Sequence, residues 1–324
     1  MYDVVILSLA EGAGPSVDAC GPAGCGGCGS VEKEVCAAPR VPVLQCADVL
    51  TRAGARVETI TAGSDAEIDA VLARFDGPPR PDGLTWPDVE NKTRLVVASA
   101  VDGQLRAVLR RLVRRYAPPP SKRPDDLATT RTVPDLPPVA LLPLDPAGTT
   151  DLAAQLGLPR TPAEVADAVL NGTVRRLDLL RNDSGSVTVD GALVGGADDD
   201  GRAVAWRGRV EVDDKVLSDG NDPILACAIG NGGGYAQFDG LALLTDGDPT
   251  DGRVEVAVAV PKVVKQRFRR GTKVQIEVRR ARGRAVSVLP RDGELQFLDD
   301  GVGGSMNRKR SWWTEPGAWA VYAS

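Results

Sequence analysis

The 324-residue chain contains no histidine. Without an imidazole it can form neither a Ser-His nor a Cys-His catalytic pair, and histidine-ligated metal sites are excluded. General-base chemistry must therefore fall to a carboxylate, lysine, cysteine or tyrosine. The sequence also lacks an apolar run of about 18 residues, so we expect no membrane-spanning helix. Its first residues show no basic segment before a short apolar run, which predicts no signal peptide and a cytoplasmic location.

The composition is that of an ordinary globular protein, with 43% hydrophobic and 26% charged residues. The length allows two domains with proper cores. The net charge of −5 argues against a general affinity for nucleic acid, so we expect no such partner.

In the first half, short runs rich in Val, Ile and Leu alternate with helical patterns. The predicted strands are residues 2–9, 57–61, 94–99 and 139–142. The predicted helices are residues 45–52, 64–75 and 104–116, and residues 118–138 are expected to form a poorly structured linker or surface loop. This alternation predicts a parallel sheet with helices on both faces, an α/β domain over residues 1–172.

The clearest helix signal comes next. Thr161 is the expected N-cap, Pro162 the first helical residue, Glu164 the partner in a capping box, and Gly172 the stop. After this helix the apolar period changes from near 3.6 to 2, as in residues 254–260. An antiparallel β-rich domain, a sandwich or folded sheet, is therefore predicted from residue 173.

Four short motifs carry the functional signal, and they follow one another between residues 95 and 294. The first is a strand followed by Asp102-Gly103, and the second combines Pro143-Leu144, Gly148-Thr149-Thr150-Asp151 and residues 156–159. The third is the glycine run 230–234 followed by Asp248 and Asp251, and the fourth is Asp292-Gly293-Glu294. A turn that leads from a parallel strand into a helix can offer backbone N–H groups to a phosphate.

In this order and spacing the motifs resemble those of the diacylglycerol kinase catalytic family, which includes sphingosine kinases and bacterial lipid kinases. The resemblance runs from about residue 57 to the C-terminus. It implies an α/β domain of the kind found in NAD kinases and diacylglycerol kinases, a β-rich domain over residues 173–302, and a final segment, 303–324, that returns to the first domain. ATP and Mg²⁺ are the implied cofactors, and a lipid is the implied substrate.

The resemblance also implies roles for individual residues. The residues that would bind the nucleotide and the acceptor are Asp102, Gly103, Gly148, Thr149 and Asp151. The family's turn has the form G-G-D-G-T, whereas here Ala100, Val101 and Gln104 replace two glycines and the threonine. Because glycine lets a backbone approach phosphate closely, these replacements predict a weakened nucleotide site.

The two acidic motifs of the second domain have alternative interpretations. Glu294 is the candidate general base for the lipid hydroxyl, with Asp292 as the second choice. Such a triplet is also common in surface turns. Asp248 and Asp251 resemble the family's acidic turn, which can hold a structural metal ion such as Mg²⁺, and a hairpin turn remains the alternative.

A cysteine-rich insertion, residues 11–42, lies outside the resemblance. Cys20, Cys25 and Cys28 have the spacing of the first three ligands in a plant-type [2Fe–2S] loop. Cys36 and Cys46 are alternative candidates for the fourth ligand. Zinc is the other metal that such a set could bind. Redox-active thiols, or a glycine-rich loop with free thiols in a reducing cytosol, remain alternatives.

Basic residues gather in two places: on the helix 104–116, and in the second half, where Arg308, Lys309 and Arg310 precede Trp312 and Trp313. Basic side chains beside tryptophan suit an anionic membrane surface, to which the protein would bind peripherally. A solvated face is the alternative. A homodimer is left open.

The sequence thus favours an ATP-dependent kinase that phosphorylates a hydroxyl of diacylglycerol or a related lipid. Two alternatives remain. One is a catalytically inactive relative that binds lipid or nucleotide in a regulatory role, which the lost glycines favour. The other is a kinase for a soluble metabolite, because NAD kinases share the G-G-D-G turn.

Overall fold

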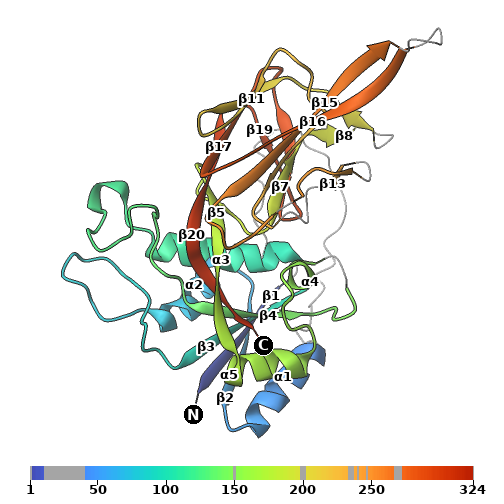
Figure 1. Cartoon of the computed structure of the whole chain (residues 1–324). Helices are drawn as coiled ribbons and strands as arrows, with labels where there is room; N and C mark the ends of the chain where they lie inside the picture. The colour runs from blue at the N-terminus through green and yellow to red at the C-terminus, as the bar shows by residue number, and fades with distance from the viewer. Residues whose placement is uncertain are drawn as a thin grey trace, which may run out of the picture.

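The computed structural model describes residues 2–10, 41–148, 151–197, 202–232, 237–238, 241–245, 247–265 and 272–323. Two parts of the molecule lie one above the other in Figure 1, an α/β part below and a β-rich part above. Among the helices of these residues, none combines the length and the apolar character needed to cross a bilayer.

Four parallel strands form the centre of the lower part. In spatial order they are β2 (Arg56–Ala62), β1 (Asp3–Leu9), β3 (Thr93–Ser99) and β4 (Pro138–Pro143). The last five residues of β3 and of β4 are all buried. Continuous burial is typical of a parallel strand covered on both faces, which explains why these segments have apolar runs without alternation.

Helices cover both faces of this sheet. On one face lie α1 (Val41–Arg52) and α5 (Pro162–Asn171), and on the other α2 (Asp65–Leu72) and α3 (Asp102–Tyr116). Shorter pieces are η1 (Ala73–Phe75), η2 (Pro120–Lys122) and α4 (Leu152–Gln155). The capping box that begins α5 is present as predicted, with Thr161 and Glu164 bonded to each other's backbone.

Two of the local predictions need correction. The first helix begins at Val41 and not at residue 45, because Pro42 is accommodated in the first turn, where its missing N–H costs no hydrogen bond. Residues 118–138 are not simply a surface loop, since Val133 and Leu136 are buried in the main core.

Two long strands connect the lower and upper parts. They are β5 (Thr173–Asn182) and β20 (Arg310–Ala323), which pair antiparallel along almost their whole length. Near its end β20 also pairs in parallel with β4, and near its start it pairs with β17 (Ala285–Pro290). One ten-stranded sheet therefore continues through both parts of the molecule (Figure 1).

The upper part is built from the far end of that sheet and a second, antiparallel one. The first contributes β10 (Gly208–Val212), β11 (Lys215–Asp219), β17 and the start of β20. The second has the order β16 (Thr272–Gly283), β15 (Val254–Lys265), β12 (Ala226–Gly230), β7 (Gly191–Val194), β18 (Leu295–Asp299) and β19 (Val302–Met306). The remaining short strands are β6 (Val187–Thr188), β8 (Gly196–Ala197), β9 (Ala203–Val204), β13 (Gln237–Phe238) and β14 (Leu241–Ala242).

Apolar side chains from both sheets form one core between them. Val210, Val288 and Trp312 come from the long sheet, and Ile229 and Val256 from the antiparallel one. The predicted fold class, a parallel α/β domain followed by an antiparallel β-rich sandwich, is confirmed.

Candidate functional site

The turn between β3 and α3 holds the first motif. Val101 is the N-cap of α3, and Asp102 is its first helical residue. Both carboxylate oxygens of Asp102 accept a hydrogen bond from the backbone N–H of Leu152, at 3.1 Å each. Asp102 thereby ties this turn to the beginning of α4, which carries the second motif. Two motifs that are fifty residues apart in the chain are in direct contact.

One backbone N–H of the turn is hydrogen-bonded to a side chain of the same turn. The Oε1 atom of Gln104 accepts a hydrogen bond from the N–H of Ala100 at 2.8 Å. The hydroxyl of Ser99 donates to the carbonyl of Val101 at 2.6 Å. A phosphate-binding turn works by presenting free N–H groups to the ligand. In this turn the glutamine that replaces the family's threonine takes one of those groups.

Gly103 lies at a close contact between the two parts of the molecule. A Cβ atom at this position would lie 2.8 Å from Cγ2 of Val302 on β19, so a larger residue would require the Val302 side chain to shift. The sequence predicts Gly103 as a cofactor-binding residue, and the structure adds this contact.

Asp151 is held from two sides. It is the N-cap of α4, where it accepts from the N–H of Ala154 at 2.9 Å, and the guanidinium of Arg160 donates to both of its carboxylate oxygens. Burial acts to raise the pKa of Asp151, but Arg160 and the cap outweigh it, so the pKa is lowered. Gly148 lies beside this pair, with a hypothetical Cβ 3.2 Å from Asp151 Oδ2. Thr149 lies outside the described residues.

The second and third motifs meet at a cavity of about 240 Å³ beside α4, which we call the α4 cavity. It is lined by Gln155 and Leu156 of α4, Leu177 of β5, and Asp190, Gly232 and Asp248 of the upper part. Asp190 could not be found by sequence reasoning, because it belongs to none of the four motifs. It is almost completely buried, and its backbone carbonyl accepts from the N–H groups of Asn231 and Gly232. The cavity is thus shared by both parts of the chain.

The predicted metal residues of the acidic turn have partners within the protein. Asp248 accepts hydrogen bonds from the N–H and the hydroxyl of Thr250, and the latter bond in particular lowers the pKa of Asp248. Asp251 forms an ion pair with Arg282, with Oδ2 2.7 Å from Nη2. Within the described part of the chain, no group of three or more acidic or cysteine residues is placed to hold a metal ion. Magnesium binding by Asp248 and Asp251 therefore stays a prediction.

The cysteine prediction falls on residues of which the structure says nothing. Cys20, Cys25, Cys28 and Cys36 all lie in the stretch 11–40, outside the described residues. Cys46 is buried in α1, and burial raises the pKa of its thiol to about 12. A thiol with this pKa stays protonated at neutral pH and makes a poor metal ligand as it stands.

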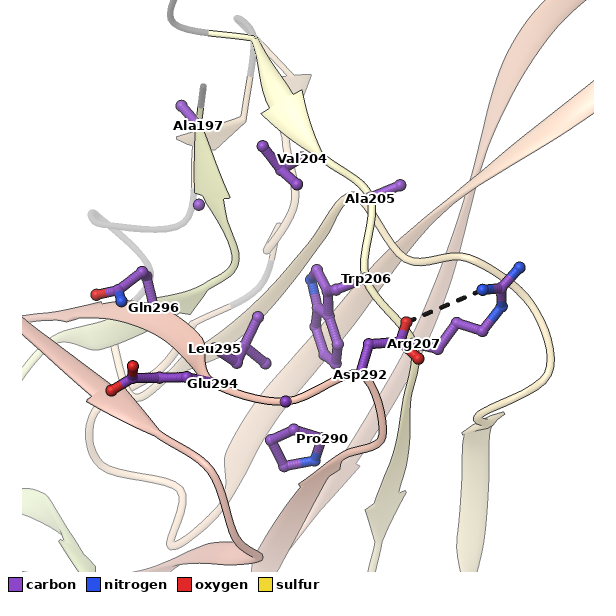
Figure 2. A pocket seen from close by; sticks show the side chains of 12 residues that line it. Ala197, Val204, Ala205, Trp206, Arg207, Pro290, Asp292, Glu294, Leu295 and Gln296 are labelled. Atoms are coloured by element: carbon purple, nitrogen blue, oxygen red, sulfur yellow. Dashed lines mark ion pairs between the residues drawn. The ribbon is translucent and has the colours of Figure 1, made fainter. Parts of the chain in front are cut away.

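The fourth motif lies in the turn between β17 and β18, apart from the α4 cavity. Asp292 and Glu294 are both exposed and line a pocket of about 260 Å³ whose apolar wall includes Trp206, Pro290 and Leu295 (Figure 2). Their side chains point in opposite directions from the turn, Asp292 toward Arg207.

Glu294 is linked to the contact between the two parts of the chain through β19. It accepts a hydrogen bond from the hydroxyl of Ser305. Ser305 lies on the same strand as Val302, which packs against Gly103. The first and fourth motifs are therefore connected through one short strand.

The similarity of the chain to known proteins concerns its fold. No family model matches the chain, and no curated protein matches it either. Among solved structures, a diacylglycerol kinase from Bacillus anthracis str. Sterne aligns with 100% of this chain and 97% of its own, with a TM-score of 0.59 and 12% identity. A second structure from the same organism, of a proposed diacylglycerol kinase, aligns with 100% of this chain and 98% of its own, with a TM-score of 0.60 and 13% identity.

The chain has the diacylglycerol kinase fold. The resemblance predicted from four short motifs is therefore confirmed at the level of structure over the whole chain. At 12–13% identity the diacylglycerol kinase fold fixes the architecture and leaves the reaction to be argued from the residues themselves.

Proposed function

We propose that the chain is an ATP-dependent kinase that transfers a phosphoryl group to a hydroxyl of diacylglycerol or a related lipid. The observation that carries this proposal is the contact of Asp102 with the N–H of Leu152, beside a cavity that both parts of the chain line. It brings the turn suited to nucleotide phosphates next to the loop suited to the acceptor. Phosphoryl transfer needs this positioning more than it needs covalent chemistry from the protein.

The roles of Asp102 and Asp151 follow from position. Asp102 would lie beside the phosphates, with the N-terminus of α3 providing a partial positive charge. Asp151, kept ionised by Arg160, would orient the acceptor loop. Glu294 takes its role from the resemblance and not from its position, since it lines a pocket separate from the α4 cavity; as the base it would accept the proton of the lipid hydroxyl. Mg²⁺, when bound with the nucleotide, would neutralise charge that develops on the transferred group. Since the acceptor is a lipid, the protein would work peripherally at an anionic membrane surface.

A second candidate is a relative that binds nucleotide or lipid without transferring phosphate. The hydrogen bond from the N–H of Ala100 to Gln104 favours it, because a nucleotide would have to displace that side chain to reach the N–H. The exposed side chain of Val101, where the family has a glycine, also stands at the turn. Both features lower affinity for phosphate without disturbing the fold.

Calorimetry of ATP binding, with and without Mg²⁺, followed by a lipid phosphorylation assay, separates the candidates. ATP binding that requires Mg²⁺, together with transfer of labelled phosphate to diacylglycerol in mixed micelles, supports the kinase. ATP binding without transfer to any lipid acceptor supports the second candidate. Absence of ATP binding by the correctly folded protein would refute the kinase.

A further inference from the structure

Five arginines from distant parts of the chain line one cleft between α3 and the β18–β19 hairpin. They are Arg106, Arg110, Arg114, Arg308 and Arg310, and we call this space of about 560 Å³ the arginine cleft. In the sequence the two basic groups are far apart, and each is expected to form a membrane-facing or solvated surface. The structure instead brings both groups to one concavity. None of the α4 cavity residues lines it.

Two of the five arginines form ion pairs with acidic residues. Arg106 donates from Nη2 to Asp299 at 2.7 Å and to the hydroxyl of Ser186, and from Nε to the carbonyl of Val187. Among the described residues, the acidic partner of Arg110 is the exposed Asp65, at 3.3 Å, and the Nε atom of Arg110 is buried without a partner.

The other three arginines have no carboxylate within ion-pair distance among the residues that the structure describes. Arg114 and Arg308 are exposed, and Arg310 lies half-buried with its guanidinium 4.9 Å from the centre of the Phe297 ring. The acidic residue that lines the cleft, Asp299, is already shared between Arg106 and Thr188. The cleft therefore carries an excess of positive charge.

The burial of the cleft arginines and their closeness to one another disfavour their charged forms. Burial lowers the pKa of Arg110, and although Asp65 counteracts this, the charges of Arg114 and Arg106 lower the pKa further. Burial likewise lowers the pKa of Arg310, partly offset by Asp183 and Asp299. Arginine remains protonated in proteins, so the repulsion persists until an anion enters.

We propose that the arginine cleft is a binding site for a small soluble anion that carries at least two phosphate groups. Guanidinium groups match phosphate oxygens in a two-pronged geometry, and unpaired guanidiniums from two walls can hold two such groups at once. The cleft volume of about 560 Å³ leaves room for a diphosphate. The cleft adjoins the turn at Asp102, because Val302 lines the cleft and packs against Gly103, but the proposal does not depend on kinase activity.

Because α3 belongs to the α/β part and Arg308 and Arg310 to the β-rich part, the bound anion would bridge the two. A ligand that binds the folded state alone raises its stability. Saturating pyrophosphate is therefore expected to raise the melting temperature of the full chain.

The test is calorimetric titration of the full chain with pyrophosphate. We expect saturable binding that Arg114→Ala and Arg308→Ala each weaken by about tenfold or more, the usual contribution of one hydrogen bond to a charged group. Lys309→Ala is the matched control, because it removes a neighbouring exposed charge that does not line the cleft. Asp102→Asn, which alters the adjoining nucleotide turn and leaves every cleft arginine in place, should weaken pyrophosphate binding less than the cleft variants do. Circular dichroism confirms that each variant is folded.

Three outcomes would overturn the proposal. One is the absence of pyrophosphate binding, and another is binding that Lys309→Ala or Asp102→Asn weakens as much as the cleft variants do. The third comes from a sedimentation assay with phosphatidylglycerol and phosphatidylcholine vesicles. If the protein binds the anionic vesicles through Arg114 and Arg308 but does not bind pyrophosphate, the arginines form a membrane contact and not a small-molecule site.

Discussion

The guanidinium of Arg106 on α3 donates to the carboxylate of Asp299 on β18 across 2.7 Å, and both side chains are buried, with relative exposures of 9% and 1%. The same arginine lies 3.8 Å from Asp300. This ion pair fastens the α/β part of the chain to the β-rich part. A buried pair of this kind is held by its hydrogen bonds, and either partner alone would be strongly disfavoured.

We therefore expect Arg106→Ala to lower the free energy of unfolding by about 3–5 kcal/mol, because it leaves Asp299 buried without a counter-charge. Arg56→Ala is the control, since its pair with Asp3 is exposed and should contribute about 1 kcal/mol or less. Urea unfolding followed by tryptophan fluorescence measures both. Equal, small effects would contradict a stabilising role for the buried pair.

Asp300 makes stability depend on pH. Burial, with the charge of Asp299, raises the pKa of Asp300 to about 8, against the effect of Arg106 and of the N–H groups of Val189 and Asp190. The folded state thus holds this proton more tightly than the unfolded chain does, so the contribution of Asp300 to stability is full below about pH 4 and is lost as pH rises through about 8.

Accordingly, the wild-type protein should lose stability relative to Asp300→Asn between about pH 4 and pH 8. Urea midpoints of the two proteins at several pH values in this window give the difference directly. Subtracting the variant removes the contribution of the other carboxylates. A difference that stays constant with pH would show that Asp300 does not titrate there.

The turn at Ala100 gives a third prediction. Gln104→Ala frees the N–H of Ala100, so ATP should bind a few-fold more tightly, on the order of 1 kcal/mol. Replacing Ala100 and Val101 by glycine should act in the same direction. Gln275→Ala, an exposed residue on β16, is the control for loss of a glutamine. Calorimetry with ATP is the measurement, and unchanged affinity in a folded variant would remove the phosphate role of this turn.

Glu294 gives a fourth prediction. Glu294→Gln keeps the shape of the side chain and removes the proton acceptor, so turnover should fall by roughly 10²-fold or more while ATP affinity stays almost unchanged. Asp292→Asn should change turnover little, because Asp292 points away from Glu294 toward Arg207 (Figure 2). Wild-type turnover in Glu294→Gln would place the base elsewhere.

Features that depend on neighbouring residues could be predicted from the sequence. The capping box of α5 is an example, because Thr161 and Glu164 are three residues apart and select their own hydrogen bonds. The order of the motifs, each tied to a strand end, was enough to indicate the fold.

Contacts between distant segments could not be predicted in this way. Nothing near Asp151 in the sequence indicates that Arg160 would fold back onto it, and Arg114 and Arg308 are 194 positions apart. The hydrogen bond of Gln104 depends on the exact path of a turn with an unusual sequence. These are the contacts that decide how the candidate site behaves, so its chemistry required the structure.

The path of β20 determines how the two parts of the molecule can move. The strand pairs with β17 at one end and with β4 at the other, and its register with β5 shifts between Glu315 and Trp319. At that interruption the buried carboxylate of Asp178 accepts from the N–H groups of Gly252 and Gly317. A movement that opens or closes the space between the two parts must therefore bend a continuous sheet at the β-bulge that Asp178 holds in place.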